Sequence, residues 1–279
     1  MTQKVGLVVD STTDLPQEWL DKWQIVVTPA FINWGSESYP DDGVAFTKAE
    51  FYQRLATSPD LPRTSAMPPG LAQEAIKLQL ERYEHVVVIG VASQFSSIYN
   101  TLKLAAQQID PNRTTAYDSG SVSMGLGWQV AAGAEVAADG GTPDQVLAAM
   151  RSTRERVKLY AAIDTLEFLR RGGRVSTLVA GLGTLLQIKP IIDVHEGEVH
   201  TFQRQRTTSR AIAALVEAAS AYGPLEKLAV LHSVNYEGAE DLQQRLSAVA
   251  PADTIIVEVT PAIGVHVGPK CLGVSFVKK

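Results

Sequence analysis

Two segments of the chain join a continuous apolar run to a hydroxyl-rich loop and then to a helix-forming stretch. In the first, residues 5–9 are mostly β-branched, residues 10–14 read Asp-Ser-Thr-Thr-Asp, and a helix is predicted over 17–22. In the second, residues 85–92 are almost entirely apolar, 93–97 are polar, and 98–108 carry apolar residues at helical spacing. Strands that are apolar on both faces are typical of parallel sheets covered by helices on both sides. The sequence therefore predicts a parallel α/β sheet.

The rest of the chain suggests a second unit. A third strand over 114–117 and helices over about 125–138 and 143–157 complete the first unit. Beyond Tyr160 the pattern changes to a hairpin over 191–202 that turns at Glu196-Gly197, a helix near 209–221 and alternating apolar residues over 228–232. We therefore predict a Rossmann-like N-terminal domain of residues 1–159 and a mixed α/β C-terminal domain of residues 160–279.

Charge and cysteine content exclude several classes of protein. The 279 residues include 25 basic and 30 acidic side chains, a formal net charge of −5, which disfavours binding to a nucleic acid backbone. The single cysteine, Cys271, rules out an internal disulfide and multi-cysteine metal sites. The longest apolar runs are strand-sized, and the first residues lack the pattern of a signal peptide. We expect a cytoplasmic protein without stable membrane insertion.

Hydroxyl groups gather in four loops. They are Ser11, Thr12 and Thr13; Thr64 and Ser65; Ser93, Ser96 and Ser97; and Ser119, Ser121 and Ser123. Hydroxyl and backbone donors at strand ends can bind an anionic head group such as a carboxylate or a phosphate. For each loop the alternative is that serine and threonine cap the helix that follows. Only convergence of several loops on one point favours a binding site.

Asp10 and Asp14 flank the first hydroxyl cluster and allow two interpretations. They could be a carboxylate nucleophile and an acid, as in enzymes that form an aspartyl phosphate. They could instead order the loop and cap backbone N–H groups. The ordering role is favoured, because the spacing differs from that of the paired aspartates of phosphoryl transfer and the sequence has no second metal-ligand cluster. Asp10 can also orient neighbouring hydroxyls.

Common catalytic motifs are absent from the sequence. It has no G-x-x-x-x-G-K-[ST] phosphate loop, no G-x-S-x-G elbow and no H-E-x-x-H zinc helix. The nearest approach to a zinc motif is His195 and His200, which are five positions apart around a glycine that suits a hairpin turn. No metal site is predicted.

Two further segments each allow a binding role and a structural one. Residues 170–174, Arg-Arg-Gly-Gly-Arg, can clamp an anion, although a helix that ends in cations and a glycine cap is favoured. His266 lies between glycines that permit close approach of the backbone, which makes it a better site candidate than the other four histidines. A structural histidine bonded to the backbone is equally compatible with this pattern.

Taken in order, the motifs resemble those of the DegV family of bacterial fatty-acid-binding proteins, over nearly the whole chain. They are Asp-Ser-Thr-Thr-Asp-Leu-Pro at 10–16, residues 39–43 before Phe51-Tyr52, Thr-Ser-Ala-Met-Pro-Pro at 64–69, Ser-Gln-Phe-Ser-Ser-Ile-Tyr at 93–99, residues 118–127, Asp-Thr-Leu-Glu-Phe-Leu-Arg-Arg-Gly-Gly-Arg at 164–174, Ile-Lys-Pro-Ile at 188–191 and His-Val-Gly-Pro at 266–269.

This resemblance implies a two-domain α/β fold with one long-chain fatty acid in a tunnel between the domains. It also implies a non-catalytic, lipid-presenting subunit of a bacterial fatty acid kinase, with no cofactor of its own. The partner kinase subunit would bring ATP and its metal and convert the fatty acid to an acyl phosphate for phospholipid synthesis.

The resemblance further implies which residues hold the fatty acid. The carboxylate ligands fall on Thr64, Ser96 and His266. Ser65 and Ser97 stand beside the first two of these, and Arg174 and Arg206 match family arginines near the tunnel mouth. Hydroxyls, an imidazole and cations can satisfy the roughly four acceptor sites of a carboxylate.

Two sites depart from the family pattern. Ser97 stands where the family usually has glycine, and Met-Pro-Pro at 67–69 replaces Gln-Pro-Ser.

Two other functions stay open at this point. One is a stand-alone phosphotransferase or hydrolase that uses Asp10 or Ser96, which would require turnover without a partner. The other is a lipid carrier or sensor that does not use a kinase, and the sequence alone does not separate it from the kinase subunit.

Overall fold

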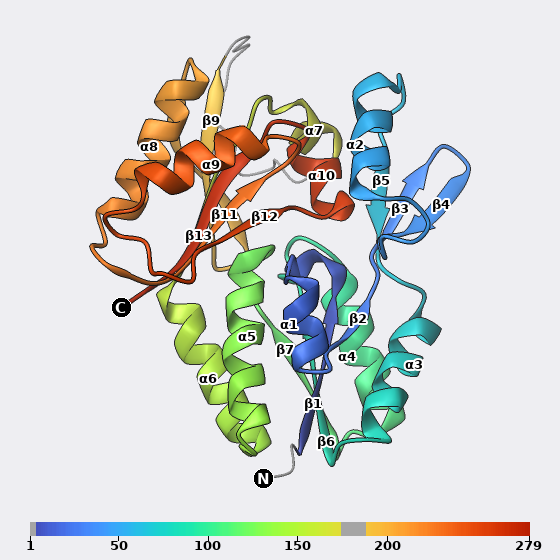
Figure 1. The fold of residues 1–279 in the computed structure, drawn as a ribbon. Coiled ribbons are helices and arrows are strands. Elements are labelled where there is room, and N and C mark those ends of the chain that lie inside the picture. The colour runs from blue at the N-terminus through green and yellow to red at the C-terminus, as the bar shows by residue number, and fades with distance from the viewer. Residues whose placement is uncertain (1–3, 174–187) are drawn as a thin grey trace.

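The computed structural model describes residues 4–173 and 188–279. Within these ranges the chain forms three β-sheets surrounded by helices (Figure 1). Among the described helices, none combines the length and the apolar character needed to span a bilayer.

The first sheet is parallel throughout. Its strands, in spatial order, are β2 (Val26–Thr28), β1 (Val5–Asp10), β6 (His85–Gly90) and β7 (Thr114–Asp118). Helices α3 (Pro69–Leu80) and α4 (Ile98–Ile109) pack on one face, and α1 (Gln17–Lys22), α5 (Met124–Ala138) and α6 (Pro143–Arg156) lie on the other (Figure 1). Successive residues of β1 serve both layers, since Leu7 and Val9 belong to the core beside α5 while Val8 belongs to the core under α3 and α4. The predicted parallel sheet with two covered faces is confirmed.

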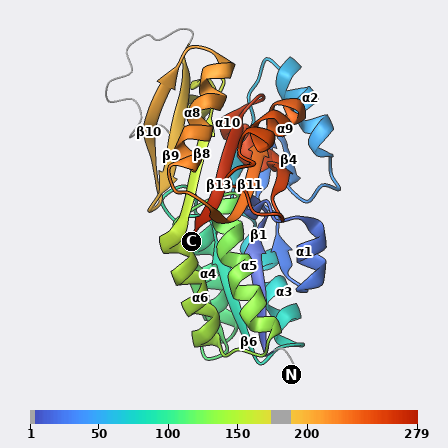
Figure 2. The same ribbon diagram turned by 60° about the vertical axis from the view of Figure 1, so that its left-hand side comes forward.

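The second sheet is mixed. Its order is β10 (Glu198–Gln205), β9 (Lys189–His195), β8 (Val157–Ala162), β13 (Leu272–Lys278), β11 (Leu225–His232) and β12 (Ile255–Glu258). Only β11 and β12 pair in parallel among these described strands. Residues alternate along the strands, so that Tyr160 and Ala162 face α8 (Thr208–Ser220) while Leu159 and Ala161 face the first part of the chain. Helices α8 and α9 (Tyr236–Arg245) cover the outer face (Figure 2).

The β9–β10 hairpin turns at Glu196 and Gly197, as the sequence predicts. Both residues have positive φ angles, 54° and 75°, which is the geometry of a two-residue type I′ turn. One predicted boundary is wrong, because the helix expected over 143–157 ends at Arg156 and Val157 already begins β8.

A third, antiparallel sheet consists of β4 (Glu37–Pro40), β3 (Phe31–Trp34) and β5 (Arg63–Ser65). This sheet and helix α2 (Lys48–Thr57) precede α3 in the sequence. Both the sheet and α2 pack against α10 (Pro261–Val267), which lies near the other end of the chain (Figure 1). The approach is close at Gly264, where a Cβ would lie 2.7 Å from the Tyr52 hydroxyl. The division of the chain at residues 159 and 160 stays a prediction.

Candidate functional site

The strand order of the first sheet places a crevice between β1 and β6. The chain passes from β1 to one neighbour, β2, and the next parallel strand, β6, joins the opposite side of β1. Loops that leave two such strands diverge, and ligands of open parallel sheets bind at this switch point. The loop after β1 contains the short 3₁₀ helix η1 (Ser11–Thr13), and the loop after β6 covers residues 91–97. The fold therefore opens a gap where two of the hydroxyl-rich loops lie.

A narrow cavity lies at this point, with about 110 Å³ accessible to the centre of a water molecule. Its wall is mostly apolar: Ala30, Val91, Phe95, Ile98, Val122, Leu169, Ile192, Val194, Val199, Ala262, Ile263 and Val267. Its polar lining residues are Thr12, Thr64, Ser96 and His266. The cavity thus combines a long apolar wall with a few hydroxyls and one imidazole.

Thr64 and His266 meet at the polar part of the cavity. Thr64 Oγ1 lies within hydrogen-bond distance of His266 Nε2, at 2.9 Å. Thr64 is on β5, where its pairing with Ile32 of β3 fixes it, and His266 is in the last turn of α10. Ser96 lines the same cavity from the loop after β6, and its Oγ accepts a hydrogen bond from the Ile98 N–H at 3.3 Å. The three residues that the resemblance assigned to carboxylate binding therefore line one cavity.

Two buried carboxyl groups hold the start of α10. Asp14 Oδ1 accepts the Thr260 N–H at 2.8 Å, and Asp41 Oδ2 accepts the Ala262 N–H at 3.3 Å. Burial raises the pKa of Asp14 to about 6 and that of Asp41 to about 7, against the opposing charge of Lys48. The positive end of a helix dipole also attracts carboxylates placed near the helix N-terminus. The N-terminal part of the chain thus anchors the helix that carries His266.

Asp10 connects the loops after β1 and β6. Its Oδ2 accepts the Val91 N–H at 2.7 Å, and its Oδ1 accepts both the N–H of Thr12, at 2.8 Å, and the Thr12 hydroxyl, at 2.5 Å. The side chain is fully buried, and this burial raises the pKa of Asp10. Since the carboxylate accepts three internal hydrogen bonds and Asp10 is not among the residues that line the cavity, the geometry fits the ordering role. Asp10 also orients Thr12, which lines the cavity.

Glycine lets the backbone approach the imidazole of His266. A Cβ on Gly172 would lie 2.5 Å from His266 Nδ1, closer than a real Cβ can come. Gly172 follows α7 (Glu167–Arg171), the last helix before the segment that the structure does not describe. The predicted helix with terminal cations and a glycine cap is therefore confirmed, and the glycine has the further effect of making room for the ring.

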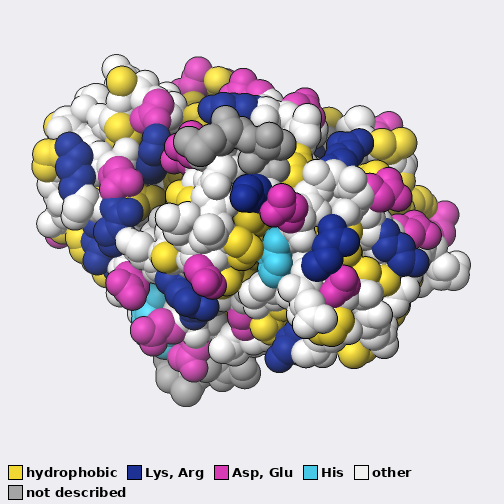
Figure 3. Space-filling model, turned by 90° about the horizontal axis from the view of Figure 1, so that it is seen from below, with side chains coloured by type: hydrophobic (Ala, Val, Ile, Leu, Met, Phe, Trp, Pro, Cys, Tyr) yellow, Lys and Arg dark blue, Asp and Glu magenta, His cyan; other side chains and the backbone are white. Residues whose placement is uncertain are grey.

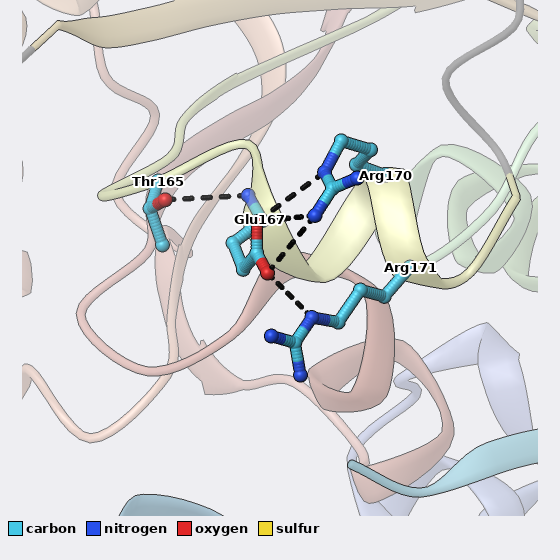
Figure 4. A network of polar contacts seen from close by, with 4 residues as sticks. All are labelled: Thr165, Glu167, Arg170 and Arg171. Atoms are coloured by element: carbon cyan, nitrogen blue, oxygen red, sulfur yellow. Dashed lines mark hydrogen bonds and ion pairs between the residues drawn. The ribbon is translucent and has the colours of Figure 1, made fainter. Parts of the chain in front are cut away.

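The cations of α7 pair with an acid of the same helix. Figure 4 shows Arg170 and Arg171 turned toward Glu167, whose backbone N–H donates to Thr165 Oγ1 at 3.2 Å. Arg170 Nη2 lies 3.2 Å from Glu167 Oε2, and Arg171 Nε forms an ion pair with the same carboxylate. Neither arginine is among the residues that line the cavity. The exposed pairs contribute little stability, at most about 1 kcal/mol.

Three other predicted site residues, Ser65, Ser97 and Arg206, are not among the residues that line the cavity. Ser65 is exposed and its Oγ accepts a hydrogen bond from Asn33, while Ser97 is exposed at the N-cap of α4. Arg206 is exposed in the link between β10 and α8. Arg174 lies outside the described residues.

Local sequence patterns did not identify Thr12 or most of the apolar wall as part of a site. Thr12 stood among the predicted hydroxyls, but nothing in the sequence separated it from its neighbours. Ile192, Val194 and Val199 come from the β9–β10 hairpin, where an alternating pattern was visible in the sequence. The pattern does not say which face of the hairpin meets the parallel sheet, so it could not identify a cavity.

The described part of the chain contains no group of three or more histidine, cysteine or acidic residues arranged to hold a metal. His195 and His200 stack across the hairpin with ring centroids 4.4 Å apart, and each lies near an acid of its own strand, Asp193 and Glu198. On the face seen in Figure 3, acidic and basic side chains are interspersed.

Similar proteins match the chain from end to end. A DegV domain-containing protein of Clostridium acetobutylicum is 31% identical over 282 residues, which covers 99% of this chain and 100% of that protein. The fatty-acid-binding DegV family protein from Thermus thermophilus has a solved structure that matches with a TM-score of 0.91 and 28% identity, over 99% and 100% of the two chains. DegV, a fatty acid binding protein from Bacillus subtilis, matches with a TM-score of 0.86 and 26% identity over the full length of both.

The mixed α/β architecture, with its parallel sheet and its six-stranded mixed sheet, is therefore the architecture of these solved structures. A model of a family described as uncharacterised DegV proteins matches residues 4–279. This chain belongs to the DegV family.

Proposed function

We propose that this chain binds one long-chain fatty acid in the cavity between the parallel sheet and the six-stranded sheet. The observation that carries the proposal is the contact between Thr64 and His266 at the polar part of a cavity whose wall is otherwise mostly apolar. Relatives of the same fold, from Thermus thermophilus and Bacillus subtilis, are fatty-acid-binding proteins, which supports the same class of ligand here.

The polar groups suit a carboxylate. Thr64 and Ser96 each carry a hydroxyl, which can donate one hydrogen bond while it accepts another. Ser96 Oγ already accepts from the Ile98 N–H and keeps its own hydrogen for a ligand. A carboxylate beside Thr64 and Ser96 would accept hydrogen bonds from both hydroxyls, and from the Nε2–H of His266 in place of that proton's contact with Thr64. Hydrogen bonds to an ionised acceptor are about twice as strong as neutral ones.

The apolar wall suits the acyl chain. Leu169 on α7, Ile192 on β9 and Phe95 in the loop after β6 come from three separate elements and enclose the cavity from different sides. Each methylene transferred from water to such a surface contributes about 0.8 kcal/mol. The head group would therefore fix the orientation of the ligand, while the tail would supply most of the affinity.

We further propose that the chain acts in the cytoplasm as the lipid-presenting subunit of a fatty acid kinase. The bound carboxylate would attack the γ-phosphorus of ATP held by the partner subunit, which gives an acyl phosphate and ADP. This chain would supply no catalytic group or cofactor. The burial of Asp10 supports that assignment over a stand-alone phosphotransferase that uses this carboxylate, because the side chain is fully buried, accepts three internal hydrogen bonds and is not among the residues that line the cavity.

The first experiment is mass spectrometry of an organic extract of gently purified protein against a matched column blank. We expect a long-chain fatty acid in a one-to-one ratio. Thr64→Val, which removes the hydroxyl at nearly constant volume, should weaken fatty acid binding about tenfold. Thr57→Val is the matched control, because Thr57 is exposed on α2 and bonds to carbonyls of its own helix. No bound fatty acid, and none taken up on incubation, would refute the binding proposal.

The kinase step needs its own experiment. The lipid-loaded chain would be mixed with a fatty acid kinase catalytic subunit and ATP, and acyl phosphate trapped with hydroxylamine. Formation of acyl hydroxamate only when both proteins are present supports the presenting role. Product without the partner would favour a stand-alone phosphotransferase, and bound lipid without product would favour a carrier or sensor.

A further inference from the structure

Val194 on β9 lines two cavities. One is the mostly apolar cavity described above, and the other, here called the polar cavity, lies between the β9–β10 hairpin, α6 and the loop after β7. The polar cavity is lined by Ser121, Arg151, Arg154, Lys158 and His195, among others, and Val194 lines both spaces. Val194 is 5% exposed. Val194, here called the partition, is therefore a buried residue at which an apolar and a polar compartment adjoin.

The two compartments differ in size and chemistry. The polar cavity has a volume of about 580 Å³, whereas the apolar cavity has a volume of about 110 Å³ on the same measure. Arg151, Arg154 and Lys158 keep the polar cavity favourable to water. An acyl chain that crossed the partition would leave an apolar wall for hydrated space, so it would gain little from its additional methylenes.

The tip of the hairpin fixes the position of the partition. The Gly197 N–H donates a hydrogen bond to the Gly120 carbonyl, at 2.8 Å, in the loop after β7. Gly197 also lies against the side chain of Gln94 in the loop after β6, where a Cβ would come within 2.3 Å of its Oε1. The hairpin that carries Val194 is thus held against the loops after β6 and β7.

The polar groups of the apolar cavity and Val194 come from elements that lie apart in the fold. Thr64 and His266 are on β5 and α10, whereas Val194 is on β9 next to the opposite sheet edge, and Figure 1 shows α10 and β9 apart on the two sides of the upper layer. A fatty acid held by its carboxylate at the first position and stopped at the second would have its length defined by the protein.

We propose that Val194 is the stop that sets the length of the bound acyl chain. This inference rests on the proposed fatty acid binding and adds a specificity-determining residue to it. Each methylene buried before the stop tightens binding about fourfold, from about 0.8 kcal/mol per methylene. Beyond the stop, a longer chain must displace Val194 or bend, and affinity no longer rises.

The test measures dissociation constants of the full chain for a series of saturated fatty acids that differ by two carbons. In Val194→Ala, which removes two carbons at the partition, the chain length of tightest binding should increase by about two carbons. In Val194→Leu, which extends the side chain, it should decrease. Val157→Ala is the matched control, since it removes the same two carbons from a residue that lines the polar cavity and is not among the residues lining the apolar one.

The outcomes separate this inference from the proposed function. Opposite shifts in the two Val194 variants, with an unchanged optimum in Val157→Ala, support the stop. An unchanged optimum in folded, lipid-binding Val194 variants overturns it and leaves fatty acid binding intact. An equal shift in Val157→Ala also overturns it, because a residue outside the apolar cavity would then change the preferred length as much as Val194 does. If the unaltered chain binds no fatty acid, the proposed function fails and the stop fails with it.

Discussion

Gly172 and His266 are in direct contact, and the contact requires that residue 172 has no side chain. A Cβ at this position would lie 2.5 Å from Nδ1 and 3.1 Å from Cε1 of the imidazole. The backbone at the end of α7 therefore forms part of the wall against which the ring of His266 rests. The opposite ring nitrogen, Nε2, faces Thr64. The orientation of the imidazole is thus set from two sides by segments distant in the sequence.

This contact predicts that Gly172→Ala weakens fatty acid binding. The added methyl group must push the imidazole toward Thr64 or displace the end of α7, and either change misplaces a group that would hold the carboxylate. We expect a loss of about tenfold in affinity, equivalent to about 1.4 kcal/mol, measured by titration with a long-chain fatty acid. Gly70→Ala on α3 is the control, because nothing lies within 4 Å of a Cβ there. Equal affinity of the two variants would contradict the role given to the contact.

Asp41 predicts an unusual dependence of stability on pH. Burial raises its pKa to about 7 in the folded chain, whereas an unfolded chain has an aspartate pKa near 4. Between these two values the folded state binds more protons than the unfolded state, so stability decreases as pH rises from about 4 to about 7. Below pH 4 the carboxyl group is protonated in both states. Above pH 7 it is ionised in both, and burying the charged carboxylate costs stability on the order of 4 kcal/mol.

Asp41→Asn should therefore stabilise the folded chain at pH 8 and leave its stability nearly unchanged at pH 4. The two hydrogen bonds recorded for this carboxylate, from Ser11 and from the Ala262 N–H, go to the same oxygen, Oδ2. The amide oxygen of asparagine can accept both. Urea unfolding at the two pH values measures the difference, and we expect a gain of about 2–4 kcal/mol at pH 8 only. A destabilised variant at pH 8 would mean that attraction to Lys48 outweighs the cost of burying the charge.

The extent to which sequence predicted this structure differs from segment to segment. The parallel sheet was predictable, because continuous apolar strands such as His85–Gly90 can be satisfied only with helices on both faces. The hairpin turn was predictable as well, because Glu196-Gly197 interrupts two alternating stretches. In both cases the signal is local, and the residues that carry it are neighbours in the chain.

The arrangement around α10 was not predictable from local pattern. Strand β5 has only three residues, and its packing beside α10 joins positions 202 apart in sequence. Family resemblance singled out Thr64 and His266, but no spacing rule could have shown that they touch. The same holds for Gly172, which the sequence suggested only as a helix cap. Close approaches of this kind depend on how whole layers pack, and a single sequence records that information only indirectly.

Asp10→Asn should destabilise the folded chain, whereas Asp41→Asn should stabilise it, although both carboxylates are buried and both have a raised pKa. Asp10 uses its two oxygens separately, one for the Val91 N–H and the other for the N–H and hydroxyl of Thr12. Asparagine has a single acceptor oxygen, so in Asp10→Asn an NH₂ group must face an N–H donor on one side. We expect a loss of about 1–3 kcal/mol in unfolding free energy at pH 8, where Asp41→Asn gains stability. Urea unfolding of the two variants under identical conditions makes the comparison. If both variants were stabilised, removal of buried charge alone would govern these sites, and the hydrogen-bond geometry assigned to Asp10 would be wrong.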